Sequence, residues 1–241
     1  MKRAIIIGAT SGIGQEVAKL LIQQGWRIGI AGRRIEALKE MQAIAPTQIE
    51  IEKIDVTEGD ATVHLHQLID KLGGMDLFLL SSGIGYQNRD LNPEVELNTA
   101  RTNVEGFIRM TTSAFSYFKE KGGGHIAVIS SIAGTKGLGV APAYSATKRF
   151  QNTYIDALAQ LSKMQHLNIQ FTDIRPGFVA TDLLKNGNYP MLMQADQVAR
   201  QIIKALDRKK RVAVIDGRYR ILVFFWQMIP RWLWERLPIK N

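Results

Sequence analysis

Residues 3–14 read RAIIIGATSGIG, an apolar run that passes directly into a glycine-rich turn. The run Ala4–Ile7 predicts a buried strand, because consecutive apolar residues are typical of a sheet that is covered on both faces. Residues 12–24 then carry apolar side chains at helical spacing, and Gly25 ends the pattern. A strand, a turn and a helix in this order leave free backbone N–H groups at the helix N-terminus, where an anion can bind. Glycine in the turn removes the Cβ that would block a pyrophosphate, although such turns also use glycine for purely steric reasons.

Apolar runs and helical patterns alternate along the whole chain. Further strands are predicted near residues 26–31, 48–54, 76–81, 125–130, 168–174 and 211–215. Helices are predicted near residues 34–42, 58–72, 98–120, 143–164 and 195–206. This alternation predicts an α/β fold, a Rossmann-type doubly wound sheet of seven parallel strands in the order 3-2-1-4-5-6-7 with helices on both faces. We expect one domain over residues 1–241, with a core over 1–216 and a C-terminal amphipathic helical extension over 217–241.

Composition and charge exclude several classes of function. The chain has 241 residues, 46% of them hydrophobic, and no cysteine, which excludes disulfide-stapled folds, thiolate metal sites and thiol catalysis. Residues 208–241 hold nine of the 31 Lys and Arg residues but only two of the 22 Asp and Glu residues. The remainder is nearly neutral, which argues against a nucleic-acid groove across the body. The basic start Met1–Arg3 precedes an apolar run too short for a signal peptide, so we expect a cytoplasmic protein.

The four histidines form no metal-binding pattern. His64 and His66 are two residues apart and point away from each other on a helix. His125 and His166 have no carboxylate cluster near them in the sequence. We therefore expect no metal site.

Further motifs follow the glycine-rich turn in a fixed order. Asp55-Val56-Thr57 comes after the third strand, and Asn103 lies on a helical pattern. Ser131 ends an apolar strand 13 residues before Tyr144, which forms a Tyr-x-x-x-Lys pair with Lys148. A Pro-Gly segment, residues 176–181, follows the sixth strand. Together with the Gly-x-x-x-Gly-x-Gly spacing of residues 8–14, these motifs resemble the short-chain dehydrogenase/reductase family over about residues 3–215.

The resemblance implies which residues act in catalysis and which bind a nicotinamide cofactor. The implied catalytic residues are Ser131, Tyr144, Lys148 and Asn103, the last of which would hold a water chain that connects Lys148 to solvent. The expected cofactor-binding residues are Gly8, Thr10, Ser11, Gly12, Ile13, Gly14, Arg33, Arg34, Asp55, Val56, Ser82, Gly83, Tyr144, Lys148, Pro176, Gly177, Val179 and Thr181.

The sequence departs from the family pattern at two places. Ile7 stands where the family has Thr, and residues 80–83 read Leu-Ser-Ser-Gly instead of Asn-Asn-Ala-Gly. Gly83 keeps the close backbone approach to the cofactor, but the two side-chain amides that would brace the sheet are absent. We expect lower stability and unchanged chemistry, because serine can still hydrogen-bond locally.

The end of the second strand, Ala31-Gly32-Arg33-Arg34, bears on the choice of cofactor. In this fold an acidic residue here holds the ribose 2′-hydroxyl, whereas arginine accommodates a 2′-phosphate. The first acidic residue is Glu36, and two guanidinium groups can form bidentate bonds with phosphate. The alternative is that the arginines only solvate a helix start, although cations are unfavourable at that end of a helix. We therefore predict NADP(H).

The Tyr-x-x-x-Lys spacing places Tyr144 and Lys148 on one face of a helix. We expect the ammonium group and the oxidised nicotinamide to lower the pKa of the tyrosine from about 10 toward neutrality, which takes roughly 4 kcal/mol of differential stabilisation. In the reductive direction Tyr144 would protonate the substrate oxygen, while Ser131 orients and polarises that oxygen. Hydride would come from the nicotinamide.

The tail from Arg218 to Leu237 combines aromatic and basic residues around Pro230. It is too short and too interrupted to cross a bilayer, and we expect an amphipathic or interfacial pair of helices kinked at Pro230. Three interpretations compete. The tail could pack on a partner subunit, form the wall of a large apolar substrate pocket, or lie on an anionic membrane surface as a peripheral contact through residues 217–241.

The segment 182–195 is apolar and contains methionine, which predicts a lid over an adaptable hydrophobic pocket. The leading hypothesis is an NADPH-dependent oxidoreductase that acts on a bulky lipid-like, steroid-like or aromatic ketone or alcohol. The alternatives are a non-catalytic NADP(H)-binding sensor or a membrane-associated scaffold, because fold does not fix function. The resemblance also implies a homodimer or homotetramer built on the helices near 98–120 and 143–164.

Overall fold

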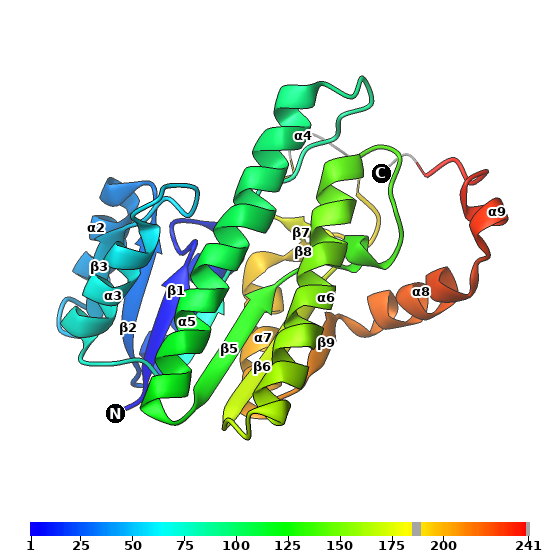
Figure 1. Ribbon diagram of the computed structural model, residues 1–241. Coiled ribbons are helices and arrows are strands. Elements are labelled where there is room, and N and C mark those ends of the chain that lie inside the picture. The colour runs from blue at the N-terminus through cyan, green and yellow to red at the C-terminus, as the bar shows by residue number, and fades with distance from the viewer. Residues whose placement is uncertain (185–188, 240–241) are drawn as a thin grey trace.

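The computed structural model describes residues 1–184 and 189–239, and it contains one large parallel sheet (Figure 1). Its seven strands lie in the order β3-β2-β1-β4-β5-β6-β9, which confirms the predicted topology. Their bounds are β3 Ile49–Lys53, β2 Arg27–Gly32, β1 Arg3–Ile7, β4 Leu77–Leu80, β5 Gly124–Ile129, β6 Ile169–Pro176 and β9 Val212–Ile215. The seventh strand is β9 because two strands absent from the prediction, β7 Val179–Ala180 and β8 Met193–Gln194, pair separately.

Strand β1 shows why an uninterrupted apolar run predicts a strand that is buried on both faces of the sheet. Successive side chains of a strand point to opposite faces, and all of Ala4–Ile7 are fully buried. Ala4 and Ile6 enter one core, while Ile5 and Ile7 enter the other. Because the sheet has a core on each face, all four positions of this run are apolar.

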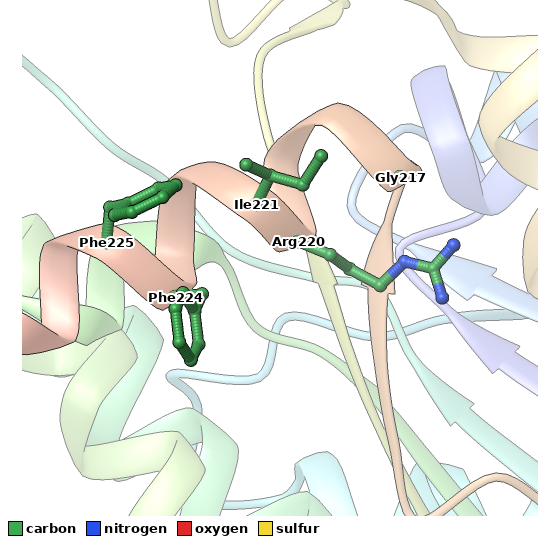
Figure 2. Close-up of a pocket in the computed structure, with 5 residues that line it drawn as sticks. All are labelled: Gly217, Arg220, Ile221, Phe224 and Phe225. Atoms are coloured by element: carbon green, nitrogen blue, oxygen red, sulfur yellow. The ribbon is translucent and has the colours of Figure 1, made fainter.

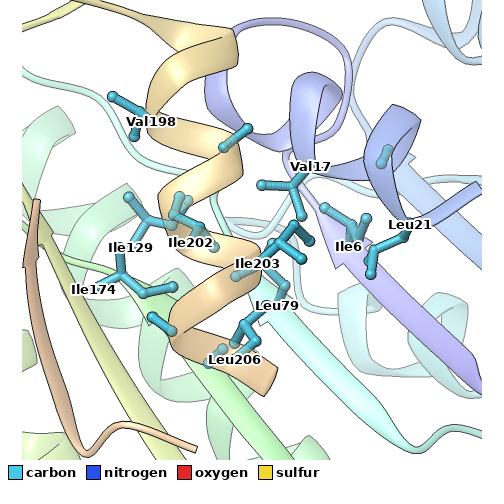
Figure 3. Packing of buried hydrophobic residues seen from close by; sticks show 14 of the residues in the cluster. Ile6, Val17, Leu21, Leu79, Ile129, Ile174, Val198, Ile202, Ile203 and Leu206 are labelled. Atoms are coloured by element: carbon cyan, nitrogen blue, oxygen red, sulfur yellow. The ribbon is translucent and has the colours of Figure 1, made fainter. Parts of the chain in front are cut away.

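Helices cover both faces of the sheet, as predicted. One core packs the sheet against α1 Gly12–Gln23, α2 Ile35–Ile44 and α7 Ala195–Asp207. Figure 3 shows Val198 and Ile202 of α7 packed with Ile129 and Ile174 of the sheet in this core. The other core packs the sheet against α3 Ala61–Leu72, α5 Phe107–Lys121 and α6 Pro142–Met164.

The helix predicted over 98–120 is longer and less regular than the sequence indicated. Helix α4 starts at Pro93 and ends at Ala100, with Asn92 accepting a capping hydrogen bond from the Glu94 backbone N–H. A π-helical segment, Arg101–Gly106, then leads into α5. Apolar periodicity does not distinguish such a segment from an ordinary α-helical turn, and π-helical turns are frequent at functional sites.

The tail after β9 forms two helices, α8 Gly217–Met228 and α9 Arg231–Trp234, with Pro230 between them. Both project from the β9 edge of the sheet (Figure 1). Apolar side chains lie on the exposed as well as the buried face of α8, which differs from the expected amphipathic pattern. None of the helices in the described part of the chain combines the length and apolar content needed to span a bilayer. The predicted lid over 182–195 and the end of the tail lie partly outside the described residues, at 185–188 and 240–241.

Candidate active site

The glycine-rich turn between β1 and α1 is built by close backbone approach. Gly8 has a φ of +89° and Gly12 a φ of +59°, backbone angles that residues other than glycine rarely adopt. A Cβ at Gly8 would lie 2.5 Å from the backbone nitrogen of Ser82, and a Cβ at Gly14 would collide with the carbonyl oxygen of Gly8. The turn is therefore packed tightly against the segment that follows β4, although that segment lacks the expected asparagines.

The N-terminus of α1 is open to a ligand. Ser11 precedes the helix in an extended conformation, and its side chain makes no capping hydrogen bond within the described chain. The first turn of the helix carries no acidic residue, so no carboxylate there neutralises the positive end of the helix dipole. The carboxylates nearest this end are those of Glu16, Asp182 and Asp196. A cavity of about 420 Å³ lies at this end and is lined by Ser11, Gly12, Gln15, Glu16, Ala180, Thr181, Asp182, Gln194, Ala195 and Asp196. This geometry fits a pyrophosphate that is held by backbone N–H groups.

The two arginines after β2 differ in their surroundings. Arg34 lies against the glycine-rich turn, where its Nη2 donates to the backbone oxygen and to Oγ1 of Thr10, each at 3.2 Å. Its Nη1 is 4.0 Å from the Asp182 carboxylate. Arg33 is exposed, and its side chain has no hydrogen-bond or ion-pair partner in the described part of the chain. Arg34 is thus positioned at the turn, while Arg33 stays available to a ligand.

The predicted catalytic residues come together at the carboxyl ends of β5 and β6. Ser131 follows β5, and its Oγ accepts a hydrogen bond from Ala133 N at 3.1 Å and donates to Pro176 O at 3.4 Å. Tyr144 lies near the Ser131 side chain, which acts to lower the pKa of the Tyr144 hydroxyl. Lys148, one helical turn further along α6, has its Nζ 5.7 Å from the centre of the Tyr144 ring.

Lys148 is held by a residue that the sequence did not indicate. Its buried Nζ donates to Ile129 O at 3.1 Å and to Gln151 Oε1 at 3.0 Å. The Gln151 amide in turn donates to the backbone oxygen of Asn103 at 2.9 Å. The Gln151 side chain therefore links Lys148 to the backbone of Asn103. Gln151 follows Lys148 by three residues on one helix, and this spacing could have indicated that the two side chains meet.

Asn103 lies fully buried in the π-helical segment and links three parts of the site. Its Nδ2 donates to Ile84 O at 2.7 Å and to Thr147 Oγ1 at 3.1 Å, and its Oδ1 accepts from Ile84 N at 2.9 Å. Both amide hydrogens are thus used within the protein. A Cβ at Gly83 would lie 3.3 Å from Asn103 Oδ1 and 3.5 Å from Lys148 Nζ, so this loop passes close to both side chains.

Burial dominates the protonation of the central pair. Burial raises the pKa of Tyr144, although the nearby Ser131 side chain opposes that shift. Burial lowers the pKa of Lys148 to about 8, against the attraction of Asp173. In the chain without a cofactor, desolvation of the phenolate is the largest effect on the pKa of Tyr144. The lowered pKa expected from Lys148 and an oxidised nicotinamide together stays a prediction. At neutral pH Tyr144 is a protonated donor.

The Pro-Gly segment is held by the tail, through another residue that sequence analysis missed. Tyr219 of α8 is fully buried, and a Cβ at Gly177 would collide with its ring. The Tyr219 hydroxyl accepts from Phe178 N at 3.1 Å and lies 3.0 Å from Pro190 O, to which it donates. The cofactor segment and the chain just before β8 are thus fixed to one phenol.

The remaining predicted residues occupy ordinary packing positions around the site. Asp55 accepts hydrogen bonds from the backbone N–H and hydroxyl of Thr57 at 3.0 and 2.8 Å. Val56 is buried against Gly106 at the end of the π-helical segment. Val179 is buried in the core, and Thr181 Cγ2 would lie 3.1 Å from a Cβ at Gly12. Ile13 packs against the α1 side of the core. The segments after β1, β3, β4 and β6 therefore surround one edge of the sheet.

Comparisons with known proteins agree with this architecture. The family model described as short chain dehydrogenase matches residues 2–190. An uncharacterized oxidoreductase of Myxococcus xanthus is 33% identical over 196 residues, which cover 79% of this chain and 77% of that protein. An uncharacterized oxidoreductase of Mycobacterium tuberculosis is 27% identical over 247 residues, covering 98% of this chain and 94% of that protein.

Two solved structures share the fold at lower identity. An actinorhodin polyketide ketoreductase with NADPH superposes with a TM-score of 0.78 at 23% identity, over 90% of this chain and 96% of that one. An alcohol dehydrogenase of the archaeon Thermococcus sibiricus, complexed with 5-hydroxy-NADP, gives a TM-score of 0.77 at 22% identity, over 89% and 95% of the two chains.

Proposed function

The chain belongs to the short-chain dehydrogenase family of oxidoreductases, and from this premise we propose that it is an NADP(H)-dependent enzyme acting on a carbonyl or secondary alcohol. The observation that carries the proposal is the convergence of Ser131, Tyr144 and Lys148 beside an open glycine-rich turn. A binding protein alone has no need of a protonated phenol aimed at the serine that would hold the substrate oxygen.

The proposed division of labour follows from the surroundings of each side chain. Tyr144, protonated because it is buried, donates its proton to the substrate oxygen during reduction. Ser131 orients that oxygen with its hydroxyl. Lys148 keeps a positive charge below pH 8 and stabilises the phenolate that the transfer leaves behind. A bound nicotinamide dinucleotide would supply the hydride.

Different segments would hold different parts of the cofactor. The turn of residues 8–14 would bind the pyrophosphate at the start of α1. Arg33 and Arg34 favour a 2′-phosphate, since Arg34 already lies at the turn and Arg33 has no competing partner in the described chain. Asp55 and Val56 would face the adenine, and the loop Ser82–Gly83 with the segment 176–181 would face the nicotinamide end.

We propose a hydrophobic substrate because the tail lies beside the catalytic group. Trp234 Nε1 donates to Gly137 O at 2.7 Å, and Lys136 Nζ donates to Ile229 O at 2.7 Å. These bonds attach the tail to the loop just after Ser131 and favour its role as a wall of the substrate pocket. In the described part of the lid Leu192 is exposed, whereas Met193 is buried in the core and Met191 packs against it. We further propose a cytoplasmic homo-oligomer, a dimer or tetramer, formed through the α4–α5 and α6 helices.

Paired calorimetric titrations of NADPH and NADH, followed by a panel of hydrophobic ketones, test the proposal. We expect tighter binding of NADPH and loss of nicotinamide absorbance with at least one ketone. The variant Arg33→Ala with Arg34→Ala should bring the two affinities together. Tight NADPH binding without turnover across the panel would favour the second candidate, a non-catalytic NADP(H)-binding sensor. Binding of neither nucleotide would refute the assignment of the glycine-rich turn.

A further inference from the structure

The outward side of α8 and α9 exposes large apolar side chains that the proposed enzyme does not use. We call this surface the aromatic face. Its members are Ile221 (63% exposed), Phe224 (59%), Phe225 (58%), Met228 (66%) and Trp232 (60%). Three of them line a shallow groove of about 650 Å³ together with Gly217 and Arg220, and Figure 2 shows both phenylalanines and Ile221 projecting from the helix. Contiguous apolar surface of this kind marks an interaction site.

The opposite side of α8 packs against the core, so the helix is held in place although its outward side is exposed. Tyr219 and Val223 are buried, and Leu222 and Trp226 pack against the same core. The helix is thus anchored along one side and apolar along the other. A helix that is apolar on all sides is normally covered on all sides, so the aromatic face calls for an occupant outside this chain's own fold.

The charges around the aromatic face identify the chemistry of that occupant. Arg220, Arg231 and Arg236 are exposed on α8, α9 and the residues just after them. Arg218 is exposed too, but it is paired with Asp216 at 2.9 Å. Glu235 is the single acidic residue within the described part of the tail after Asp216. The guanidinium of Arg236 lies 5.7 Å from the centre of the Trp232 ring, which pairs a cation with an interfacial aromatic. Arginine stems can lie along apolar surface while the charged heads remain at the level of phosphates.

We propose that the aromatic face binds the surface of a bilayer that contains anionic lipids, with α8 and α9 lying in the plane of the interface. Aromatic and aliphatic side chains would enter the boundary of the acyl chains, and the arginines would contact lipid phosphates. A second copy of this chain fits less well. A two-fold interface sets each patch against itself, which would bring the arginines of one copy against those of the other.

Flotation with phosphatidylcholine vesicles, with and without phosphatidylglycerol, tests this surface on the full chain. We expect the protein to float with the anionic vesicles and to stay behind with the neutral ones. Phe224→Ser with Phe225→Ser should reduce vesicle affinity by about tenfold or more, and Arg220→Gln with Arg236→Gln by about fivefold for each arginine. The matched controls are Ile44→Ser with Val63→Ser, which are 64% and 55% exposed elsewhere, and Lys119→Gln with Lys163→Gln.

Thermal unfolding of each variant verifies that the fold is kept, and light scattering without lipid reports the assembly state. Equal flotation of the phenylalanine variant and its control would overturn the proposal, as would equal recovery on neutral and anionic vesicles. A dimer in the absence of lipid that the phenylalanine variant converts to a monomer would assign the face to a second copy instead. NADPH binding and turnover are measured independently of vesicle binding. A protein that does not bind vesicles would therefore not contradict the proposed enzymatic function.

Discussion

At the scale of single residues, the hydroxyl of Tyr144 carries the proposed chemistry. Tyr144→Phe removes the proton donor but keeps the ring beside Lys148. We expect turnover to fall by about 10²–10⁴-fold while NADPH affinity is retained. Steady-state kinetics and calorimetry measure the two effects separately. Tyr154→Phe on the same helix is the control and should leave turnover close to that of the parent. Retention of most activity in Tyr144→Phe would remove this residue from the mechanism.

Gln151 gives a second prediction, because its two variants should act in opposite directions. Lys148 loses its positive charge through a pKa of about 8, so activity that needs the ammonium group falls above that pH. Gln151→Leu removes an acceptor that favours the charged form and should move the alkaline limb to lower pH. Gln151→Glu places a carboxylate there and should move the limb to higher pH. The pH profile of kcat/KM measures both shifts, and a shared direction would reduce Gln151 to a packing role.

The sequence predicted the residues of local motifs and missed those fixed by distant contacts. Ser131, Tyr144 and Lys148 were predicted from the family resemblance, which rests on motifs that are short in sequence. Gln151 acts on the site through Asn103, 48 residues away, and Tyr219 acts through Phe178, 41 residues away. The burial of Tyr144, which raises its pKa, was not predictable either, because residue spacing shows a nearby lysine but not how deeply a side chain is buried.

At the scale of elements, α8 and the Pro-Gly segment are interlocked. Gly177→Ala should force the ring of Tyr219 and the segment apart, because the added methyl group has no room. We expect a cost of about 1–3 kcal/mol in the free energy of unfolding and weaker NADPH binding. Thermal unfolding and calorimetry measure these effects. Gly59→Ala, where nothing lies within 4 Å, is the matched control.

A compensating change sharpens this test. Tyr219→Leu together with Gly177→Ala relieves the collision and should restore part of the lost NADPH affinity. The pair should therefore cost less than the two single changes added together, because the residues are in contact. Strict additivity would mean that the overlap is relieved elsewhere in the segment.

Element types were more predictable than their irregularities. Long runs such as β1 and the apolar stripe of α1 determined the alternation of strands and helices. The π-helical segment 101–106 and the two-residue strands β7 and β8 were not predictable. A π-helical segment of six residues is too short for its wider turn to show in the apolar spacing, and two-residue strands are too short for any periodicity.

At the scale of the whole molecule, the topology brings the site together. The turns after β1, β3, β4, β5 and β6 meet at the carboxyl edge of the sheet, where doubly wound folds bind ligands. Residues far apart in sequence therefore needed no individual prediction, since strand order alone placed their segments together. The tail was the exception. Its charge and aromatic content marked it as distinct, but its contacts with Gly177 and Gly137 depend on packing that composition does not encode.

Two truncations separate the structural part of the tail from the part beside the substrate. Removal of residues 229–241 deletes α9 and the Trp234–Gly137 hydrogen bond but keeps Tyr219 and Val223 in the core. We expect the Tm to stay within about 4 °C of the full chain, with a higher KM for hydrophobic ketones and a similar kcat. Removal of residues 217–241 also takes away the buried Tyr219 and should cost roughly 3–5 kcal/mol, or about 10 °C in Tm. Differential scanning calorimetry and ketone kinetics on both truncations measure the contrast. If removal of residues 217–241 leaves the Tm unchanged, the packing of Tyr219 does not stabilise the molecule. If removal of residues 229–241 leaves KM unchanged, α9 is not a wall of the substrate pocket.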